Sequence, residues 1–259
     1  MSERIEAPEP SFDAPDTTTL DLGRRLDALD ALDTPDARDA TDVRVPADAE
    51  FLAWHEGEGD TGPRRYERAG DRLPWTEHPD NDHAEDYDWH PDLEREVQDT
   101  YAAHGFDGAT VERINAIRAE KPTANCGECA RSVASTLDGC PRSAAAIDQK
   151  LPGEDMEDME TWAGARFGAE DATDQGLDAI DRELTERGDG AQAVLAVRRR
   201  NGDGHYLNAA RIDGQTMIID AQPEGGRMLP LERGGREYLH NHKFTSVQWM
   251  PLDRSPRNV

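Results

Sequence analysis

Apolar residues become regularly spaced from residue 91 onward. Over 93–104 and again over 109–119 they recur every three or four positions, which is the spacing of one face of an amphipathic helix. Before residue 91 no such pattern persists, because bulky apolar residues are few there. The pattern therefore predicts that the folded domain occupies residues 91–259 and begins with two helices.

The next predicted helix has both of its ends marked in the sequence. Pro122 ends the preceding helix, and Asn125 is a favourable N-cap for a helix that runs through CGECARSVASTL. Gly139 marks the end of this helix, because glycine readily adopts the left-handed conformation found after helices. Cys126 is thereby placed in the first helical turn.

Beyond this helix the pattern predicts two more helices and then a run of strands. The helices cover 157–167 and 176–187, and the strands cover 191–198, 205–212, 216–220 and 245–251. NGDG at Asn201–Gly204 and the dipeptide Asp213-Gly214 are hairpin-turn sequences, so the first three strands are expected to form an antiparallel meander. The last strand is expected at an edge of the sheet. Together these elements predict an α+β fold.

Residues 1–90 have a different composition from the rest of the chain. They are rich in Asp, Pro, Ala and Thr, as in segments that cannot bury enough apolar surface to offset the entropy lost on ordering. We expect an acidic, largely disordered segment. It contains His78, His83 and His90, but their spacing matches no zinc motif and no cysteine accompanies them, so we interpret them as part of a solvated loop.

The charge of the chain argues against several classes of partner. It has 55 acidic and 29 basic residues and a net charge of -26 at pH 7, so it repels nucleic-acid phosphates and anionic lipid surfaces. No stretch approaches the roughly 20 apolar residues of a transmembrane helix, and the N-terminal MSERIEAPEP lacks the features of a secretory signal peptide. We expect a soluble protein that binds neither nucleic acid nor membranes. It would be cytoplasmic, or exported by a route that needs no such peptide.

The cysteines are the first candidates for chemistry. Cys126, Cys129 and Cys140 fall within 15 residues, and an odd number in a long chain does not indicate a secreted disulfide framework. A cysteine at a helix N-terminus feels the positive end of the helix dipole and the unsatisfied amides, and both favour the thiolate. Cys126 is preferred as a nucleophile because it directly follows the cap, whereas Cys129, one turn later, is placed to pack inward. Cys140, after a turn, is interpreted as structural.

Thiol catalysis also needs a histidine that holds the proton and a carboxylate or amide that orients it. His205 opens one predicted strand directly after its turn, and Asp220 ends the neighbouring antiparallel strand. In a tight hairpin the start of one strand faces the end of the next, so the two side chains are expected to meet. Alone, His205 would be interpreted as a surface histidine and Asp220 as a turn residue. Their joint placement instead predicts a centre made of Cys126, His205 and Asp220.

Three motifs together resemble the papain-fold glutamine deamidases that occur as toxin domains of bacterial polymorphic toxins and effectors. They are NCGECARSVASTLDG at Asn125–Gly139, GHYLN at Gly204–Asn208 and IIDAQ at Ile218–Gln222. The resemblance covers residues 110–222, under half of the chain, and rests on the order and spacing of the motifs. It implies a papain-like fold, in which an N-terminal nucleophile helix packs on an antiparallel sheet.

The resemblance also implies a role for each residue of the site. Cys126 would be the nucleophile, His205 the general base and Asp220 the residue that orients it, while Asn125 and Gln222 would line the site. The implied reaction is attack on a glutamine carboxamide of a target protein, which gives a thioester and ammonia, followed by hydrolysis to glutamate. Backbone amides at the helix start would stabilise the oxyanion. No cofactor or metal is needed, and a cognate immunity protein is a further candidate partner.

Four alternatives remain open at this point. Papain keeps its nucleophile as the second cysteine of a similar CGxC string, so Cys129 is an alternative to Cys126. A zinc site could use both of these cysteines with His240 and His242, although more than a hundred residues separate the two pairs. A papain-like protease would use the same triad on a different amide. A non-catalytic acidic binding or immunity-type module would use none of these residues for chemistry.

Overall fold

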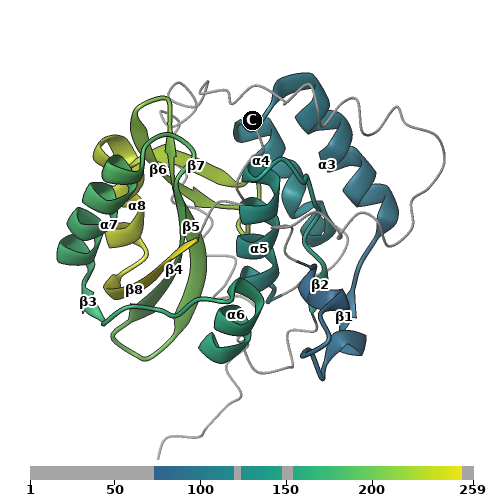
Figure 1. Ribbon diagram of the computed structural model, residues 1–259, viewed down its shortest axis with the longest axis horizontal. Coiled ribbons are helices and arrows are strands. Elements are labelled where there is room, and N and C mark those ends of the chain that lie inside the picture. Colours follow the sequence, from purple (N-terminus) through teal and green to yellow (C-terminus); the bar gives the residue numbers. More distant parts are fainter. Residues whose placement is uncertain (1–72, 120–123, 148–153, 253–259) are drawn as a thin grey trace, which may run out of the picture. The chain divides into compact units, whose positions relative to one another are not determined.

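The computed structural model describes residues 73–119, 124–147 and 154–252 (Figure 1). All of them belong to the compact unit Ala37–Val259, whereas Met1–Asp36 lies entirely outside the described residues. The first 72 residues of the predicted acidic segment lie outside them too. The described part combines helices with an antiparallel sheet, which confirms the predicted α+β class.

A six-stranded antiparallel sheet forms the centre of the described unit, in the order β3-β8-β4-β5-β6-β7. Its strands are β3 Asp171–Ala172, β4 Gln192–Arg199, β5 Gly204–Ile212, β6 Gln215–Asp220, β7 Arg227–Pro230 and β8 Phe244–Leu252. Strands β4, β5 and β6 are neighbours in sequence and in space, as the two hairpin-turn sequences predicted. A separate two-stranded sheet pairs β1, Tyr87–Asp88, with β2, Ala146–Ile147.

Strand β8 lies inside the sheet, so its predicted edge position was wrong. It pairs with β4 along nearly its full length and with the two-residue strand β3 on its other side. Val247 and Met250 are both fully buried but belong to different core clusters, because successive residues of a strand point to opposite faces. Strand β3 is too short to produce a recognisable sequence pattern, which is why its pairing with β8 escaped prediction.

Helices cover both faces of this sheet (Figure 1). They are α3 Pro91–His104, α4 Gly108–Ile114, α5 Cys126–Leu137, α6 Met156–Ala163, α7 Thr173–Arg187 and α8 Arg236–Asn241, with short helical segments η3 Trp75–Glu77, η4 Ala84–Asp86, η5 Ala116–Ala119 and η6 Leu231–Gly235. Leu207 and Ile218 pack with α7 and α8, whereas their neighbours Tyr206 and Met217 pack on the side of α5. Because both faces are buried there, the middle of β4 and of β6 is a continuous apolar run rather than an alternating one.

The helix predicted over 109–119 is broken at Asn115. Helix α4 is capped at its start by the Asp107 side chain, which accepts a hydrogen bond from the Thr110 N–H at 3.0 Å. Asn115 leaves the helical conformation, with φ -111° and ψ 37°, and the chain continues as the short segment η5. This break directs the Asn115 side chain toward the site described below.

The folded domain begins no later than Leu73, so the predicted boundary at residue 91 was placed too late. Trp75 is 2% exposed and packs in the same cluster as α5 and α6. The indole N–H of Trp162 donates to the carbonyl of Leu73 at 3.0 Å, and β1 pairs with β2. Burial of this one large aromatic residue anchors residues 73–90 despite their acidic composition. Within this stretch His83 is exposed, whereas His78 contacts the Trp75 ring.

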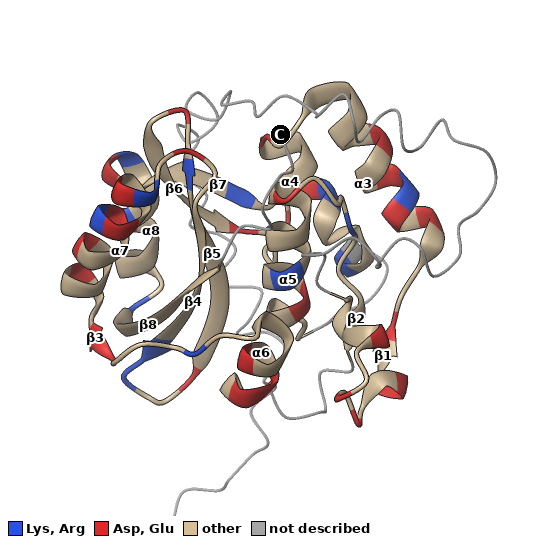
Figure 2. Ribbon diagram, viewed as in Figure 1, with Lys and Arg blue, Asp and Glu red and all other residues tan. Residues whose placement is uncertain are grey.

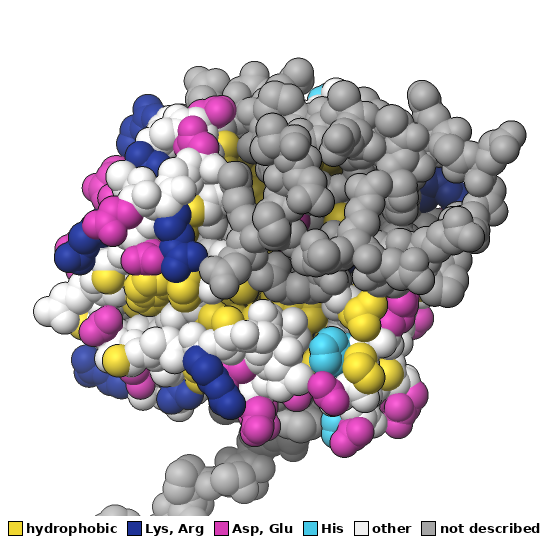
Figure 3. Space-filling view, viewed as in Figure 1, with side chains coloured by type: hydrophobic (Ala, Val, Ile, Leu, Met, Phe, Trp, Pro, Cys, Tyr) yellow, Lys and Arg dark blue, Asp and Glu magenta, His cyan; other side chains and the backbone are white. Residues whose placement is uncertain are grey.

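Charged residues lie mainly on the outer sides of the helices. Figure 2 shows acidic residues along α3, α6 and α7. On the face drawn in Figure 3, apolar side chains gather across the middle of the described surface and charged side chains surround them. Among the described residues Trp89 is the one exposed large apolar side chain, and none of their helices is long and apolar enough to span a membrane. Apart from buried carboxylates such as Glu94, the acidic side chains along these helices therefore face solvent, and the sheet interior is mainly apolar.

Candidate active site

Helix α5 brings the Cys126 thiol against the start of strand β5. Cys126 is the first residue of the helix, and its sulfur forms hydrogen bonds with the His205 side chain and with the backbone N–H of Tyr206. The Asn208 side chain, further along β5, donates to the carbonyl of Ala130 on α5 at 3.0 Å. Asn208 is 1% exposed, so this bond ties helix and strand together from within the core. The GHYLN motif thus supplies the groups that hold the thiol in place.

His205 and Asp220 meet at one end of the β5–β6 hairpin. In the register of the two strands Asn208 faces Ile219, which places Asp220, the last residue of β6, diagonally across from His205. His205 Nε2 lies 2.6 Å from Asp220 Oδ2. With Nε2 engaged by the carboxylate, the other ring nitrogen of His205 is left to face the Cys126 sulfur. The structure therefore brings together the three side chains that the sequence singled out.

The Asp220 carboxylate is buried and fully hydrogen-bonded. It is 1% exposed, and besides His205 it accepts a bond from the Tyr238 hydroxyl at 2.8 Å on Oδ2. Its Oδ1 accepts the backbone N–H of Gln222 at 3.0 Å. A buried carboxylate with this many donors is favoured in its ionised form, and it cannot rotate without losing bonds.

The three groups shift one another's pKa values toward an ion pair. Burial alone would raise the pKa of Cys126, but the hydrogen bond and positive charge of His205 outweigh it and lower that pKa. Burial alone would lower the pKa of His205, yet Asp220 raises it to about 10. The pKa of Asp220 is lowered, against the effect of its burial, mainly by the charge of His205. The environment therefore favours the charged forms of all three groups, with Cys126 and His205 as a thiolate–imidazolium pair.

Cys129 has the opposite environment. It is 1% exposed in the cluster formed by α3, α4, α5 and the sheet, and burial raises its pKa well above the ordinary value. The nearby charges of Asp220 and Cys126 raise that pKa further. Of the two cysteines in the CxxC string, only Cys126 has a histidine partner and a lowered pKa, so the geometry favours Cys126 as the nucleophile.

A buried amide network supports the site from behind. Asn125 Nδ2 donates to Asn115 Oδ1 at 2.9 Å and to the carbonyl of Ala145 at 2.7 Å. Asn115 Nδ2 in turn donates to the carbonyl of Gln222 at 2.9 Å, and Arg118 donates to the same carbonyl at 3.2 Å. The network thus joins Asn125, which precedes Cys126, to Gln222, whose backbone N–H bonds the Asp220 carboxylate.

Asn125 and Gln222 thus differ in detail from the prediction that both line the site. The Asn125 side chain is 2% exposed, forms no cap of α5 and points into the amide network instead. Gln222 acts through its main chain, whose N–H bonds Asp220 and whose carbonyl accepts two bonds. Both residues position the site from the side. Asn125 does precede α5 as predicted, but its side chain makes no capping bond, because the two bonds donated by Nδ2 hold the amide toward Asn115 and Ala145.

A buried ion cluster fixes the opposite side of α5. Arg131 is 3% exposed and donates to Glu128 Oε1 at 2.8 Å and, with both of its terminal nitrogens, to the carboxylate of Glu154. Its guanidinium also lies over the rings of Trp75 and Trp162, at 4.9 and 5.8 Å from their centroids. These contacts hold α5, and with it Cys126, against α6 and the segment before α3.

The zinc alternative is not formed by the residues that the structure describes. His240 Nε2 faces Asp174 at 3.1 Å, and His242 Nδ1 faces the carbonyl of Tyr238 at 2.8 Å. Nowhere in 73–119, 124–147 and 154–252 do three or more His, Cys, Asp or Glu side chains gather in a way that could hold a metal ion. His240 and His242 are therefore engaged with groups other than the two cysteines.

Two residues of the site could not be found from the sequence. Tyr238 reaches Asp220 from α8, a six-residue helix with no motif of its own, and Asn115 joins the site only because α4 ends there. The Asn of GHYLN was visible in the sequence, but its bond to the helix backbone depends on how α5 crosses β5. Cys126, His205 and Asp220 could be picked out from their neighbours in the sequence. Tyr238 and Asn115 reach the site only through contacts between elements that are distant in the sequence.

Part of the chain is similar to known proteins. Residues 124–225 match the family described as papain fold toxin 1, glutamine deamidase, and this range contains all three motifs. The match confirms the resemblance and the papain-like fold expected from it. Among solved structures the chain is similar to the Salmonella effector SpvD in its G161 variant, with 12% identity and a TM-score of 0.43, over 56% of this chain and 76% of that one. Comparison with curated proteins gives no match.

Proposed function

We propose that this chain, whose residues 124–225 match the papain fold toxin 1 family, is a cysteine-dependent amidohydrolase that deamidates glutamine side chains of a target protein. The observation that carries the proposal is the connected set of Cys126, His205 and Asp220, with a sulfur–imidazole hydrogen bond and a 2.6 Å imidazole–carboxylate contact. This order of groups is the one that nucleophilic thiol catalysis requires.

In the first half of the reaction the Cys126 thiolate attacks the carbon of the glutamine carboxamide. A carbon–sulfur bond forms, and the developing oxyanion faces the N–H groups of the first turn of α5, which have no intrahelical partners. The imidazolium of His205 then gives its proton to the departing nitrogen, and the carbon–nitrogen bond breaks with release of ammonia. The product is a thioester between Cys126 and the former glutamine side chain.

In the second half His205, now neutral, removes a proton from water. The hydroxide attacks the thioester carbonyl, the carbon–sulfur bond breaks, and the thiolate of Cys126 is restored with glutamate as the product. Asp220 keeps the imidazole in one orientation and stabilises its protonated form through both halves. No metal and no cofactor enters these steps.

The family description as a toxin supports placing this activity in a toxin or effector domain. The partners in this proposal are a target protein with an accessible glutamine and a cognate immunity protein that blocks the site in the producing cell. The domain would act in the cytoplasm or after export from the producing cell. Papain-like proteolysis is the second activity that the same three groups support, because the same attack can act on a main-chain amide as well as on a side-chain amide.

The test is quantitative mass spectrometry of a bacterial and a eukaryotic cell extract treated with the full chain. We expect specific glutamines to gain about one dalton with the wild-type protein and none to do so with Cys126→Ala, since the thioester cannot form. New chain termini without deamidation would identify a protease instead. Extracts that stay unchanged with the wild-type protein would contradict both activities and favour a non-catalytic binding module.

A further inference from the structure

The segment from Tyr238 to Phe244 lies beyond the family match, which ends at residue 225, yet both of its ends contact the site. Tyr238 donates its hydroxyl to the same Asp220 oxygen that faces His205, at 2.8 Å. Phe244, the first residue of β8, stacks on the His205 ring with 6.0 Å between centroids and 8° between planes. One short segment therefore contacts both members of the imidazole–carboxylate pair.

His242 connects these two contacts. Its ring lies 4.3 Å from that of Tyr238 and 6.2 Å from that of Phe244, the latter nearly parallel at 14°. The contacts form a closed ring that runs from Asp220 through Tyr238, His242 and Phe244 to His205 and back to Asp220. In such a ring no member can shift without displacing its neighbours.

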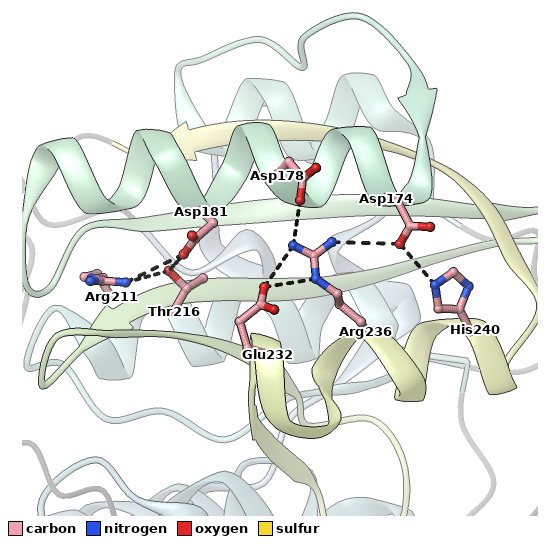
Figure 4. A network of polar contacts seen from close by, with 8 residues as sticks. All are labelled: Asp174, Asp178, Asp181, Arg211, Thr216, Glu232, Arg236 and His240. Carbon is pink, nitrogen blue, oxygen red and sulfur yellow. Dashed lines mark hydrogen bonds and ion pairs between the residues drawn. The ribbon is translucent and has the colours of Figure 1, made fainter.

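The segment also contacts α7 through the polar side chains of α8, which Figure 4 shows. Arg236 donates to Asp178 on α7 at 2.7 Å and to Glu232 at 2.9 Å, and His240 faces Asp174 at 3.1 Å. Positions 236 and 240 are one turn apart on one side of α8, so position 238 projects to the other side. Helix α8 is thus fixed to α7 by one face and presents Tyr238 to the carboxylate from the other.

The turn after α8 is built to deliver Phe244. Lys243 has φ 59°, a left-handed conformation that is uncommon for a residue with a side chain. Arg199 of β4 holds the turn, because its Nε donates to the carbonyl of His242 at 2.9 Å and its guanidinium lies 4.6 Å from the centre of the Phe244 ring. A strained backbone kept in place by such contacts is typical of functional positions.

We propose that Tyr238 and Phe244 are positioning residues of the reaction: Tyr238 fixes the Asp220 carboxylate, and Phe244 fixes the plane of the His205 ring. The inference rests on the proposed function and extends the active domain past the family match to at least the start of β8. Tyr238 also shares the charge of Asp220 with His205. Without that hydroxyl the carboxylate is a stronger acceptor and holds the imidazolium proton more tightly, which slows its transfer to the leaving nitrogen.

The primary test is Tyr238→Phe, which removes one oxygen and keeps the ring. The matched control is Tyr87→Phe. The Tyr87 hydroxyl donates to Glu154 at 3.4 Å and makes no bond with Asp220. With a glutamine peptide found in the extract experiment, we expect kcat of Tyr238→Phe to fall about tenfold with KM unchanged. The control should keep the wild-type kcat. Equal kcat values in wild type and Tyr238→Phe would overturn the proposal.

A second readout needs no turnover and so separates this inference from the proposed function. The titratable groups that act on His205 are Asp220 and Cys126, and NMR can follow its ring protons in the folded protein. In Tyr238→Phe the His205 ring should titrate at higher pH than in wild type, and in Tyr87→Phe at the wild-type pH. An unchanged titration in Tyr238→Phe would overturn the proposal even if no deamidation were found.

Two further variants guard against a purely structural effect. Incorporation of 3-fluorotyrosine at position 238 keeps the size and makes the hydroxyl a better donor, so His205 should titrate at lower pH, opposite to Tyr238→Phe. Phe244→Leu keeps an apolar side chain but removes the flat surface. Because the ring is buried, the unfolding midpoint should fall modestly, and we expect kcat to fall several-fold at temperatures where the variant is fully folded. Shifts in the same direction for both Tyr238 changes, or a wild-type kcat for Phe244→Leu, would contradict the assigned roles.

Discussion

Cys126 and Cys129 lie one turn apart on α5, and their pKa values are shifted in opposite directions. Cys126 is hydrogen-bonded to His205 and has a lowered pKa, whereas Cys129 is enclosed in the core and has a raised one. The two thiols differ because Cys126 faces His205, whereas Cys129 faces the core on another side of the same helix. Helix position alone, the argument available from the sequence, explains only part of this difference.

The first prediction concerns the reactivity of these thiols. Iodoacetamide at neutral pH is expected to alkylate Cys126 well before Cys129 and Cys140, because the thiolate is the reactive form. Cys126→Ala should abolish deamidation, while Cys129→Ala should retain most of it and lose mainly stability through the small cavity left in the core. Peptide mapping of the labelled protein identifies the site. Faster labelling of Cys129 than of Cys126 would show that Cys126 is not the nucleophile.

The second prediction concerns pH. Activity should rise as Cys126 loses its proton, below the ordinary cysteine pKa, and should fall when His205 loses its proton near pH 10. Asp220→Asn removes the charge that raises the His205 pKa, so the alkaline limb should move to lower pH and kcat should drop about 100-fold or more. The measurement is kcat/KM against pH for both proteins. An alkaline limb that stays in place in Asp220→Asn would show that the carboxylate does not act on His205.

The third prediction concerns the ion cluster behind α5. Arg131→Leu leaves the carboxylates of Glu128 and Glu154 buried without their partner, and the free energy of unfolding should fall by about 3–5 kcal/mol. The control is Arg95→Leu, since both side chains of the Arg95–Asp92 pair are largely solvent-exposed and such pairs contribute little. Urea unfolding of both variants decides the matter. Equal losses in the two variants would mean that the Arg131 cluster contributes no more than a surface pair.

The fourth prediction concerns the amide network. Asn125→Ala removes the donor that serves Asn115 and the carbonyl of Ala145, both buried, and should lower the free energy of unfolding by about 1–3 kcal/mol. Because Asn115 in turn holds the carbonyl of Gln222, kcat should fall several-fold while the Cys126 thiol remains reactive toward iodoacetamide. Comparison of urea unfolding, kcat and alkylation rate tests this. A wild-type kcat in Asn125→Ala would show that the amide network does not contribute to catalysis.

Local signals were sufficient to predict that the side chains of Cys126, His205 and Asp220 come together. A capping position before Cys126, a tight turn before His205 and another before the strand that ends in Asp220 fix where each residue falls on its element. The hairpin then brings the last two together through its register. Each of these steps depends on neighbours in sequence, which a single chain displays directly.

The supports of the site depend on contacts that no local pattern encodes. Tyr238 reaches Asp220 only because α8 is fixed to α7, and Trp75 belongs to the domain only because its ring meets α5 and α6. The interior place of β8 likewise depends on a two-residue partner strand. Acidic composition misplaced the domain boundary for the same reason, since one buried tryptophan can outweigh many solvated carboxylates.

The thiolate–imidazolium pair is the claim on which the mechanism depends, and ultraviolet titration of the thiolate tests it most directly. The difference in absorbance near 240 nm between wild type and Cys126→Ala should persist at pH values well below the ordinary cysteine pKa. The same difference, measured in a His205→Ala background, should appear only at higher pH. A wild-type thiolate signal that arises only at or above the ordinary cysteine pKa would contradict the account.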